Sequence, residues 1–405
     1  MPSAKAAGSS PAQTMNASQA NMAARQLILA RAIEMKQQVY SSTFNPAQQP
    51  TINVQPRYAG LIRKFIVFFS ATIANNDGAL GLTLTDFGLS NFLSPNSGVV
   101  LTDLNNNQRI NTGGWHLGLI NSIKHRKPFA APYALAQPTV AGIVQANDMA
   151  NYGPNFPLVV APETIAHGFT TTVSGYYEVP VSYDHQDLRG AIYANVVNAT
   201  MQLSLTINPT PFTAAGVDST FSMYKGTAAA AITSVTVTVY QDYLYQLPVG
   251  KQGTILPLSD LATVYELKNT SLNAVPQNQD FGFQYPNFRD VLSTYSIFDH
   301  DTTTDTGRQV GQDINNWKLQ SANFTNIFQL DPLTFSLPTR AILGTDLPPG
   351  CYYSSSRQKP ISTVQYGNIE LVLNASTSTS NSLWSIGLED FSYPNTIAMA
   401  GSLQS

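Results

Sequence analysis

Apolar residues alternate with polar ones over most of the chain, and this period of two is typical of β-strands. The clearest example is Ile232–Tyr245, where Val235, Val237 and Val239 are separated by threonines. Segments rich in Asn, Gly and Pro, such as Asn151–Pro154, lie between the alternating stretches and favour turns. Many strands, long polar loops and almost no long helices predict an all-β fold of the sandwich or jelly-roll type.

The predicted strands form two groups on either side of residues 239–269, where the alternation stops. Pro248 ends the preceding strand, and Ser259 or Asp260 can cap a helix over 258–269. We interpret this segment as a hinge between two β domains of similar class; the alternative is an ordinary crossover inside one domain. The predicted strands are Leu61–Ile73, Ala79–Thr85, Gly98–Leu104, Trp115–Ile123, Thr170–Tyr183, Ile192–Ile207, Ile232–Tyr245, Tyr295–Phe298, Phe324–Leu330, Phe335–Ile342, Cys351–Tyr353, Ile361–Leu373 and Leu383–Leu388.

A basic amphipathic helix is predicted near the N-terminus, over Met22–Tyr40. Residues 1–20 are rich in Ala, Ser, Gln and Asn, and we expect them to be flexible. Such a helix can lie on a membrane surface or dock on a partner; the alternative is that its apolar side packs on its own domain. The apolar stripe comprises Ile28, Ala32, Met35 and Val39, and the basic residues away from it are Arg25, Arg31 and Lys36.

Charged residues are scarce, at 11% of the chain against ~25% in an average soluble protein. A subunit whose flanks lie against other subunits benefits from neutral polar side chains, because they cost less to desolvate than charges. A secreted β protein with a similar surface is the alternative. The single cysteine, Cys351, excludes an internal disulfide framework. No run of about 18 apolar residues is present, so no membrane-spanning helix is expected.

The positive charge is concentrated at one end of the sequence. Residues 1–76 contain seven basic residues and one acidic residue, for a net charge of +6, whereas the whole chain has a net charge of −3. This distribution predicts that one end of the molecule meets an anionic partner, either a phospholipid surface or nucleic acid.

Candidate chemistry is weak throughout the sequence. Asp299–Asp305 offers oxygen ligands suited to calcium, but it lacks the glycine and the closing glutamate of an EF-hand loop, so a solvated polar loop is favoured. Glu163 and Asp187 are a possible glycosidase pair whose separation the sequence does not give. Cys351 lies beside aromatic residues and is interpreted as a small buried side chain rather than a nucleophile. We therefore expect a protein that is not an enzyme and that holds no metal or cofactor.

Several segments resemble, in the same order, the major capsid protein of tectiviruses, which are icosahedral bacterial viruses with an internal membrane. The matches run from about Asn45 to about Asp390, whereas residues 1–20, Tyr133–Asn155 and Asp301–Gln309 do not match clearly. The matching segments are Leu84–Gly88, Gly114–Leu117, Pro162–Gly168, Tyr176–Val196, Val239–Asn269, Leu330–Pro332 and Asp346–Asn374.

The resemblance implies a double jelly roll, with two eight-stranded barrels in one chain. It implies an arm and amphipathic helix over 1–45, a first jelly roll over 46–247 and a second over 248–405 that includes the linker helix. Three copies would form a trimer with a pseudo-hexagonal outline that tiles an icosahedral shell around an internal membrane and a double-stranded DNA genome. The membrane-facing residues expected on this basis are Arg25, Arg31 and Lys36.

The expected partners are two further copies of the chain, neighbouring trimers, minor virion proteins and the internal membrane, without sequence-specific binding of nucleic acid. The expected location is the capsid shell of a virion assembled in the cytoplasm of a host bacterium. The alternative function is that of a virion spike or a secreted carbohydrate-binding β protein, which would present a groove lined by aromatic residues.

Overall fold

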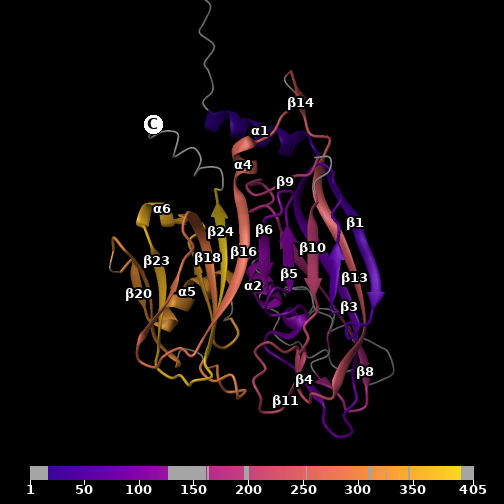
Figure 1. Ribbon diagram of the computed structural model, residues 1–405, viewed down its shortest axis with the longest axis vertical. Coiled ribbons are helices and arrows are strands. Elements are labelled where there is room, and N and C mark those ends of the chain that lie inside the picture. Colours follow the sequence, from indigo (N-terminus) through magenta and orange to yellow (C-terminus); the bar gives the residue numbers. More distant parts are fainter. Residues whose placement is uncertain are drawn as a thin grey trace, which may run out of the picture.

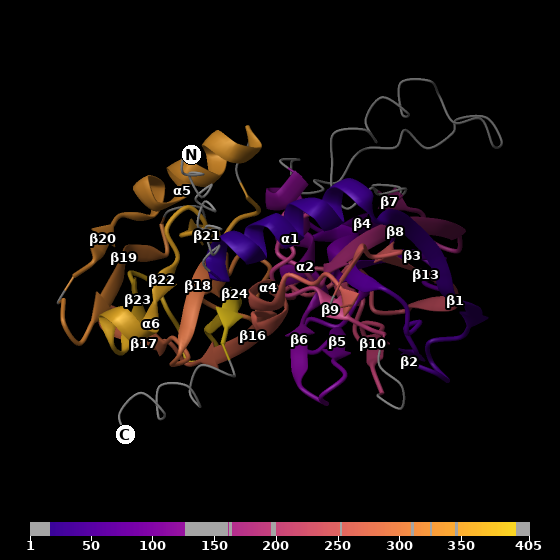
Figure 2. The same cartoon turned by 90° about the horizontal axis from the view of Figure 1, so that it is seen from above.

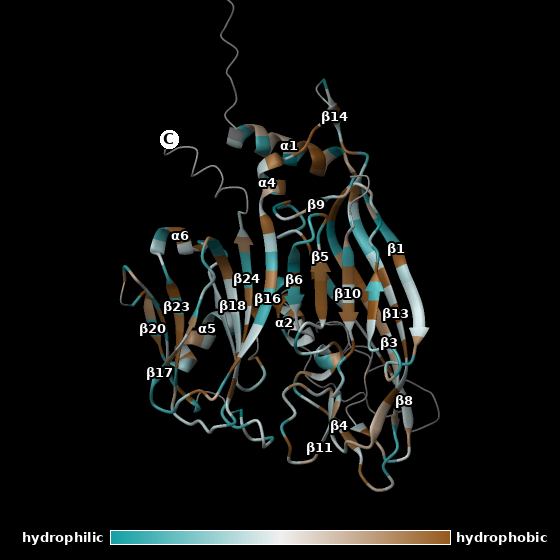
Figure 3. Ribbon diagram, viewed as in Figure 1, coloured by the Kyte–Doolittle hydropathy of each residue, from teal (hydrophilic) through white to brown (hydrophobic). Residues whose placement is uncertain are grey.

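The computed structural model describes residues 17–125, 161, 164–195, 200–251, 253–308, 312–324, 326–344 and 347–393. These residues form two β-rich halves that stand side by side (Figure 1). Along the longer strands of both halves, hydrophilic and hydrophobic residues alternate (Figure 3), as expected where one face of a sheet packs on a core. None of the described helices is long and apolar enough to cross a membrane.

The first half consists of two sheets with orders β1-β13-β3-β8 and β2-β10-β5-β6. Their inward side chains form the largest hydrophobic core, which includes Phe65, Phe69, Phe92 and Tyr177. The strands are β1 (Ile33–Phe44), β2 (Thr51–Val54), β3 (Leu61–Asn75), β5 (Val99–Thr102), β6 (Gln108–Thr112), β8 (Thr170–Pro180), β10 (Gln202–Thr206) and β13 (Ala230–Tyr245).

The second half has the sheet orders β16-β24-β18-β21 and β17-β23-β19-β20. Its core is centred on Trp317 and Trp384, whose ring centroids are 5.7 Å apart. The strands are β16 (Val264–Asn273), β17 (Asp280–Gln284), β18 (Arg289–Asp299), β19 (Ile314–Ser321), β20 (Phe328–Leu330), β21 (Cys351–Ser355), β23 (Ile369–Ala375) and β24 (Leu383–Ser392).

The two halves have the same topology. If the eight strands named for each half are numbered in chain order, one sheet of each half has the order 1-8-3-6 and the other has the order 2-7-4-5. This is the strand order of a jelly roll, in which the first strand pairs with the last. The predicted double jelly roll is confirmed.

The remaining elements are short or lie outside the barrels. Strands β4, β7, β11 and β12 form a small separate sheet at one end of the first half, and β14 pairs with β15 at the opposite end (Figure 1). The bounds are α1 (Ala17–Arg31), β4 (Leu82–Leu84), η1 (Gly88–Phe92), α2 (Gly114–His125), β7 (Thr164–Ile165), β9 (Ile192–Tyr193), β11 (Phe212–Ala214), β12 (Tyr224–Gly226), β14 (Val249–Gly250), β15 (Gly253–Thr254), α4 (Leu258–Ala262), α5 (Pro332–Leu343), β22 (Ile361–Ser362) and α6 (Thr363–Tyr366).

A shared sheet joins the halves. Strand β6 of the first half pairs in parallel with β16 of the second, with Ile110 opposite Leu267 and Asn111 opposite Lys268. Ile110 and Leu267 are fully buried, and the hydrophobic core of the first half extends across this junction to Tyr265 and Tyr295. The halves therefore share both backbone hydrogen bonds and a core.

Two predicted strands, Trp115–Ile123 and Phe335–Ile342, are wrong, because the structure has helices α2 and α5 there. Helix α2 is buried on all sides over Gly114–Ile123, so it has no polar face to reveal a helical period. Helix α5 did carry helix signals. The Asp331 side chain accepts hydrogen bonds from the first turn, and Gly344 ends the helix with a left-handed φ of 72°.

The sequence predicts two helices, over 22–40 and 258–269, that are longer than the helices α1 and α4 of the structure. Helix α1 ends at Arg31, and residues 33–44 form β1 instead of continuing the helix to Tyr40. Helix α4 ends at Ala262, and β16 replaces the rest of the helix predicted to Asn269; neither Ser259 nor Asp260 caps it. In both cases the segment pairs as a strand with the last strand of its barrel, β1 with β13 and β16 with β24. This pairing outweighs the local preference for a helix.

Some predicted strands are interrupted, and others were missed. Ile192–Ile207 contains the separate strands β9 and β10, and Ile361–Leu373 contains β22, α6 and β23. Of the jelly-roll strands, β1, β2, β6, β16, β17 and β19 were not predicted. Polar residues such as Lys268, Thr270 and Asn273 in β16 interrupt the alternation that the prediction relied on.

Candidate functional site

The N-terminal helix α1 lies across the end of the molecule that also carries α4 and β14 (Figure 1). Ile28 is fully buried in a small hydrophobic cluster with Leu61, Leu188 and Leu244. Leu261 of α4 packs against the same cluster. The apolar side of the helix therefore packs on its own chain, which is the alternative that the sequence left open.

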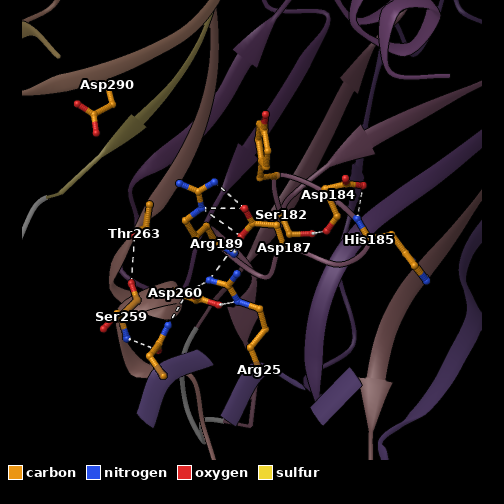
Figure 4. Close-up of polar contacts among 12 residues, drawn as sticks. Arg25, Ser182, Asp184, His185, Asp187, Arg189, Ser259, Asp260, Thr263 and Asp290 are labelled. Carbon is orange, nitrogen blue, oxygen red and sulfur yellow. Dashed lines mark hydrogen bonds and ion pairs between the residues drawn. The ribbon is translucent and has the colours of Figure 1, made fainter. Parts of the chain in front are cut away.

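Arg25 anchors α1 to α4 through Asp260 (Figure 4). Its Nε donates to Oδ2 and its Nη2 to Oδ1 of Asp260, both at 2.6 Å, and Asn21 Nδ2 adds a third bond to Oδ1 at 2.8 Å. The hydrogen bonds to Asp260 raise the pKa of Arg25 above its ordinary value. Arg25 is thus committed to a two-pronged ion pair within the chain.

Asp187 lies on the other side of Arg25, 3.9 Å from Nη2, and is held mainly by Arg189. Arg189 Nε and Nη2 donate to Asp187 Oδ2 at 2.9 and 2.6 Å. Burial pushes the pKa of Asp187 upward, but the bonds from Arg189 outweigh it and lower that pKa. Asp187 therefore has a structural role, and Glu163, its proposed catalytic partner, lies outside the described residues.

The three predicted membrane-facing residues do not share one helical face. Arg25 is paired as above, Arg31 is exposed in the last turn of α1, and Lys36 lies on strand β1. The Lys36 ammonium is 3.9 Å from the Glu34 carboxylate, with both side chains exposed. The sequence did not reveal that Asp260 is the partner of Arg25, because 235 residues separate them.

Helix α2 fills the space between the two jelly rolls. The His116 ring lies 5.0 Å from the Tyr295 ring, and its Nδ1 is 2.6 Å from Thr112 Oγ1. Gly387 of β24 lies directly beneath, where an added Cβ would be 2.3 Å from the imidazole. Complete burial lowers the pKa of His116 to about 3, so this histidine is neutral at physiological pH.

A buried charge network lies at the far end of α2. Lys124 Nζ is 3.5 Å from the fully buried Glu389 carboxylate, which also accepts from Arg357 Nη2 at 2.6 Å and Ser293 Oγ at 2.5 Å. Burial raises the pKa of Glu389, but Arg357 and Lys124 more than offset this and lower it to about 2. Burial lowers the pKa of Lys124 to about 8. The network ties the first half to the second.

The segment Asp299–Asp305, which was considered as a calcium loop and for which a solvated polar loop was favoured, makes a second contact between the halves. Thr220 Oγ1 of the first half donates to Asp299 Oδ2 at 3.0 Å, and Ser219 and Lys225 contact Asp305. Burial and the neighbouring Asp218 raise the pKa of Asp299 to about 7. Among the described residues, no group of three or more His, Cys, Asp or Glu side chains could hold a metal ion.

Cys351 also lacks the environment of a nucleophile. It is buried at the start of β21, and burial raises the pKa of its thiol to about 12. A thiol that stays protonated reacts poorly, because the thiolate is the reactive form.

Comparison with known proteins places these features in a family. A model described as the P3 major capsid protein N-terminal matches residues 3–247, and one described as P3 major capsid protein C-terminal matches residues 262–405. The chain is 37% identical over 388 residues to the major capsid protein P3 of Enterobacteria phage PRD1, covering 95% of this chain and 94% of that protein. The chain belongs to the P3 major capsid protein family.

Solved structures agree on the fold. The atomic structure of Sulfolobus Turreted Icosahedral Virus matches with a TM-score of 0.62 at 12% identity, covering 91% of this chain and 93% of that chain. The PBCV-1 virus capsid matches with a TM-score of 0.50 at 11% identity, covering 89% and 94%.

Membership of the P3 family establishes that the chain is a major coat protein and a component of the capsid shell of a virion. The alternative of a spike or a secreted carbohydrate-binding protein is set aside by this match. The two family models leave residues 248–261 between them, which include β14, β15 and all of α4 except its last residue, Ala262.

Proposed function

We propose that three copies of the chain form a trimer with a pseudo-hexagonal outline, and that trimers tile an icosahedral shell around an internal membrane and a double-stranded DNA genome. The observation that carries this proposal is the repeated topology, in which both halves have the same two sheet orders. Six barrels of one topology from three chains give a trimer with six similar edges. Neighbouring trimers and minor virion proteins would meet these edges.

We further propose a division into an N-terminal arm with α1, a first jelly roll and a second jelly roll. The predicted limits of 1–45, 46–247 and 248–405 need one change, because β1 over 33–44 is the first strand of the first jelly roll. The connection between the jelly rolls contains β14, β15 and α4. Since β16 pairs with β6, this connection does not act as a free hinge.

The proposed role is mechanical and not enzymatic. Among the strongly perturbed groups, Glu389, Lys124 and Asp299 lie at contacts between the halves, and Asp187 is tied to arginines. Glu389 lies in a buried ion pair with Lys124 and Arg357, and Asp299 accepts from Thr220, so both groups are used in contacts between the halves. Assembly in the host cytoplasm, without sequence-specific contacts to nucleic acid, fits this role.

For the membrane contact we propose the end of the molecule that carries α1 and β14 (Figure 1). Arg31 is exposed there, and Lys251 is exposed in the turn between β14 and β15. Each basic side chain near an anionic lipid surface contributes on the order of 1 kcal/mol, so many copies in a shell bind far more tightly than one. Of the other predicted residues, Arg25 supports the position of α1, and Lys36 lies further along on β1.

Mass measurement in dilute buffer tests the trimer. We expect sedimentation equilibrium to give three chain masses and negative-stain images to show six-lobed particles. A stable monomer at micromolar concentration would refute the trimer.

Co-sedimentation with vesicles containing anionic phospholipid tests the membrane role. We expect Arg31→Ser to bind vesicles more weakly than the unchanged protein, and Lys318→Ser, which removes a positive charge from β19, to bind as well as the unchanged protein. Equal binding by all three proteins would count against a membrane contact through Arg31.

A further inference from the structure

We propose that a cavity between the two jelly rolls binds the phosphate of a phospholipid headgroup, and that the exposed ring of Phe288 at its rim enters the lipid interface. The proposal rests on the membrane contact proposed above and adds a binding site to it. That contact was assigned to Arg31 and Lys251, and neither residue lines this cavity.

The cavity lies where the second jelly roll meets the first. It has a volume of about 490 Å³, and its walls come from the starts of β16 and β18, the end of β24 and the turn before β6. One residue, Thr263, separates β16 from α4. The start of β16 and the end of β24 therefore place the cavity at the end of the molecule that carries α4 and α1 (Figure 1).

Two cations at the cavity are held by one buried carboxylate. Arg289 Nη1 donates to Glu266 Oε1 at 2.5 Å, and the Lys268 ammonium contacts Glu266 Oε2. Ser392 Oγ also donates to Glu266 Oε1, at 2.7 Å. Burial pushes the pKa of Glu266 upward, but the hydrogen bonds from Lys268, Ser392 and Arg289 outweigh it and lower that pKa. Glu266 is therefore ionised and positions both cations.

Both cations have donors left for a ligand. Among the described residues, the bond from Nη1 to Glu266 is the only hydrogen bond that the Arg289 side chain donates, although all three guanidinium nitrogens carry N–H groups. The Lys268 side chain is 42% exposed. A guanidinium can bind two phosphate oxygens at once, and a neighbouring ammonium adds a point charge. Amide side chains with further N–H donors also line the cavity, and these are Asn106, Asn107, Gln108 and Asn287.

A second carboxylate, Asp390, offsets this positive charge only in part. Its Oδ1 is 3.7 Å from Arg289 Nη1, and its side chain is buried. Burial raises the pKa of Asp390 to about 7, so this carboxyl is largely protonated below neutral pH. Lys268 and Arg289 then face one ionised carboxylate, and the cavity attracts anions.

Two lining residues have backbone conformations that residues other than glycine rarely adopt. Asn106 has a φ of 61° and Phe288 a φ of 59°. Asparagine tolerates this left-handed region, but a bulky residue in it is unusual. Such conformations are concentrated at functional sites, where the surrounding structure holds them in place. Here the strained backbone presents the Phe288 ring, which is 60% exposed.

The Phe288 ring is one of several exposed apolar side chains at this end of the molecule. Val249 of β14, Leu258 of α4 and Val364 of α6 are 74%, 71% and 66% exposed. Figure 1 shows β14, α4 and α6 at the same end as α1. A phospholipid interface takes up apolar side chains and cations together. The phosphates of a nucleic acid duplex would bind the cations and leave the apolar side chains in water.

The first test measures binding to vesicles of equimolar phosphatidylcholine and phosphatidylglycerol by co-sedimentation. We expect Lys268→Gln in the full chain to raise the apparent dissociation constant about fivefold, because one basic side chain is lost from the contact. Lys225→Gln is the matched control. Its side chain is 39% exposed and is also paired with a carboxylate, that of Asp305, but it lies on β12 at the opposite end. Equal binding by both variants would overturn the proposed site.

The second test follows Phe288 directly. Phe288→Cys is labelled with a fluorophore that responds to solvent polarity, and the native Cys351 is buried, so labelling is confined to the new thiol. We expect the emission to shift to the blue when vesicles are added. Phe169→Cys is the control, because Phe169 is 65% exposed and lies next to β8 at the opposite end, and its label should not shift. An unchanged spectrum at position 288 would show that the ring does not enter the lipid.

The outcomes separate this site from the general membrane contact. Vesicle binding that is weakened by Arg31→Ser but not by Lys268→Gln would overturn the cavity and leave the membrane contact intact. No binding by the unchanged protein would overturn both.

Two further ligands test the assignment to a lipid. If Lys268→Gln weakens binding of a DNA duplex and leaves vesicle binding unchanged, the ligand is nucleic acid. If calorimetry shows inorganic phosphate binding that Lys268→Gln removes, again with vesicle binding unchanged, the ligand is a free anion. Either result would overturn the proposal, whereas a loss of vesicle binding together with the spectral shift at position 288 would support it.

Discussion

Helices α2 and α5 occupy the same place in the two jelly rolls but differ in burial. In α2 every residue from Gly114 to Ile123 is buried, because the helix contacts its own barrel on one side and the second barrel on the other. In α5 the buried residues are Pro332, Phe335, Thr339 and Leu343, and Phe335 stacks on Trp317 of its own barrel. The difference shows that α2 is covered on both sides within one chain, whereas α5 is covered on one side only.

The largest expected effect comes from breaking the charge network behind α2. Glu389→Gln leaves Lys124 and Arg357 without their shared carboxylate in a buried site, and we expect it to lower the free energy of unfolding by about 3–5 kcal/mol. Urea denaturation of the variant and the unchanged protein measures the difference. A loss below about 1 kcal/mol would mean that the network does not hold the barrels together.

A smaller effect is expected where α2 meets β24. Gly387→Ala forces a Cβ to within 2.3 Å of the His116 ring, so the helix must move away from the sheet. We expect a loss of about 1–3 kcal/mol in urea denaturation. Gly78→Ala, where an added Cβ meets no atom within 4 Å, is the control and should be near neutral. Equal stability of the two variants would contradict tight packing at this contact.

The two polar contacts between the barrels should respond to pH in opposite directions. The pKa of Glu389 is lowered to about 2, so its contribution is present above the ordinary pKa of 4.5 and is lost as the pH falls toward 2. The pKa of Asp299 is raised to about 7 from 3.8, so the folded protein binds the extra proton and stability from this group falls as the pH rises from about 4 to 7.

Asp299→Asn removes the second response. We expect the variant to lose the decline in stability between pH 4 and pH 7 that this group contributes, measured by urea denaturation at several pH values. An unchanged slope would show that Asp299 titrates with an ordinary pKa.

The smallest effect is expected on the outer sheet of the second barrel. Asp280→Asn removes the carboxylate that accepts from Lys318 Nζ at 2.6 Å, in a pair whose acidic partner is largely exposed. Solvent screens such pairs, so we expect a change of ~0.5 kcal/mol or less in urea denaturation. A loss as large as that of Glu389→Gln would mean that burial does not distinguish the two ion pairs.

The sequence predicted the all-β class, the division into two similar halves and the family. Long alternating strands such as β3 and β13 were found because one of their faces is buried and the other is not. Helix α2 could not be found in this way, since it is buried all round. For α5, Asp331, Pro332 and Gly344 gave usable helix signals, but Pro338 inside the helix argued against them.

The contacts between the halves were beyond sequence reasoning for a different reason. Glu389 meets Lys124 and Arg357 only after β24, α2 and the segment after β21 are brought together by the fold. Likewise, the sequence suggests Asp260 only as a helix cap and Arg25 only as a membrane-facing residue, whereas the fold pairs the two. Local patterns describe elements, whereas these ion pairs depend on how distant elements are placed.

The parallel pairing of β6 with β16 has a consequence for the shape of a shell. Any rotation of one barrel against the other would break backbone hydrogen bonds and open a shared core. Bending is therefore confined to the contacts between molecules, where side chains can adjust without disturbing a sheet. The angle between the two barrels is thus encoded in the polypeptide itself, and the curvature of the shell is decided where separate chains meet.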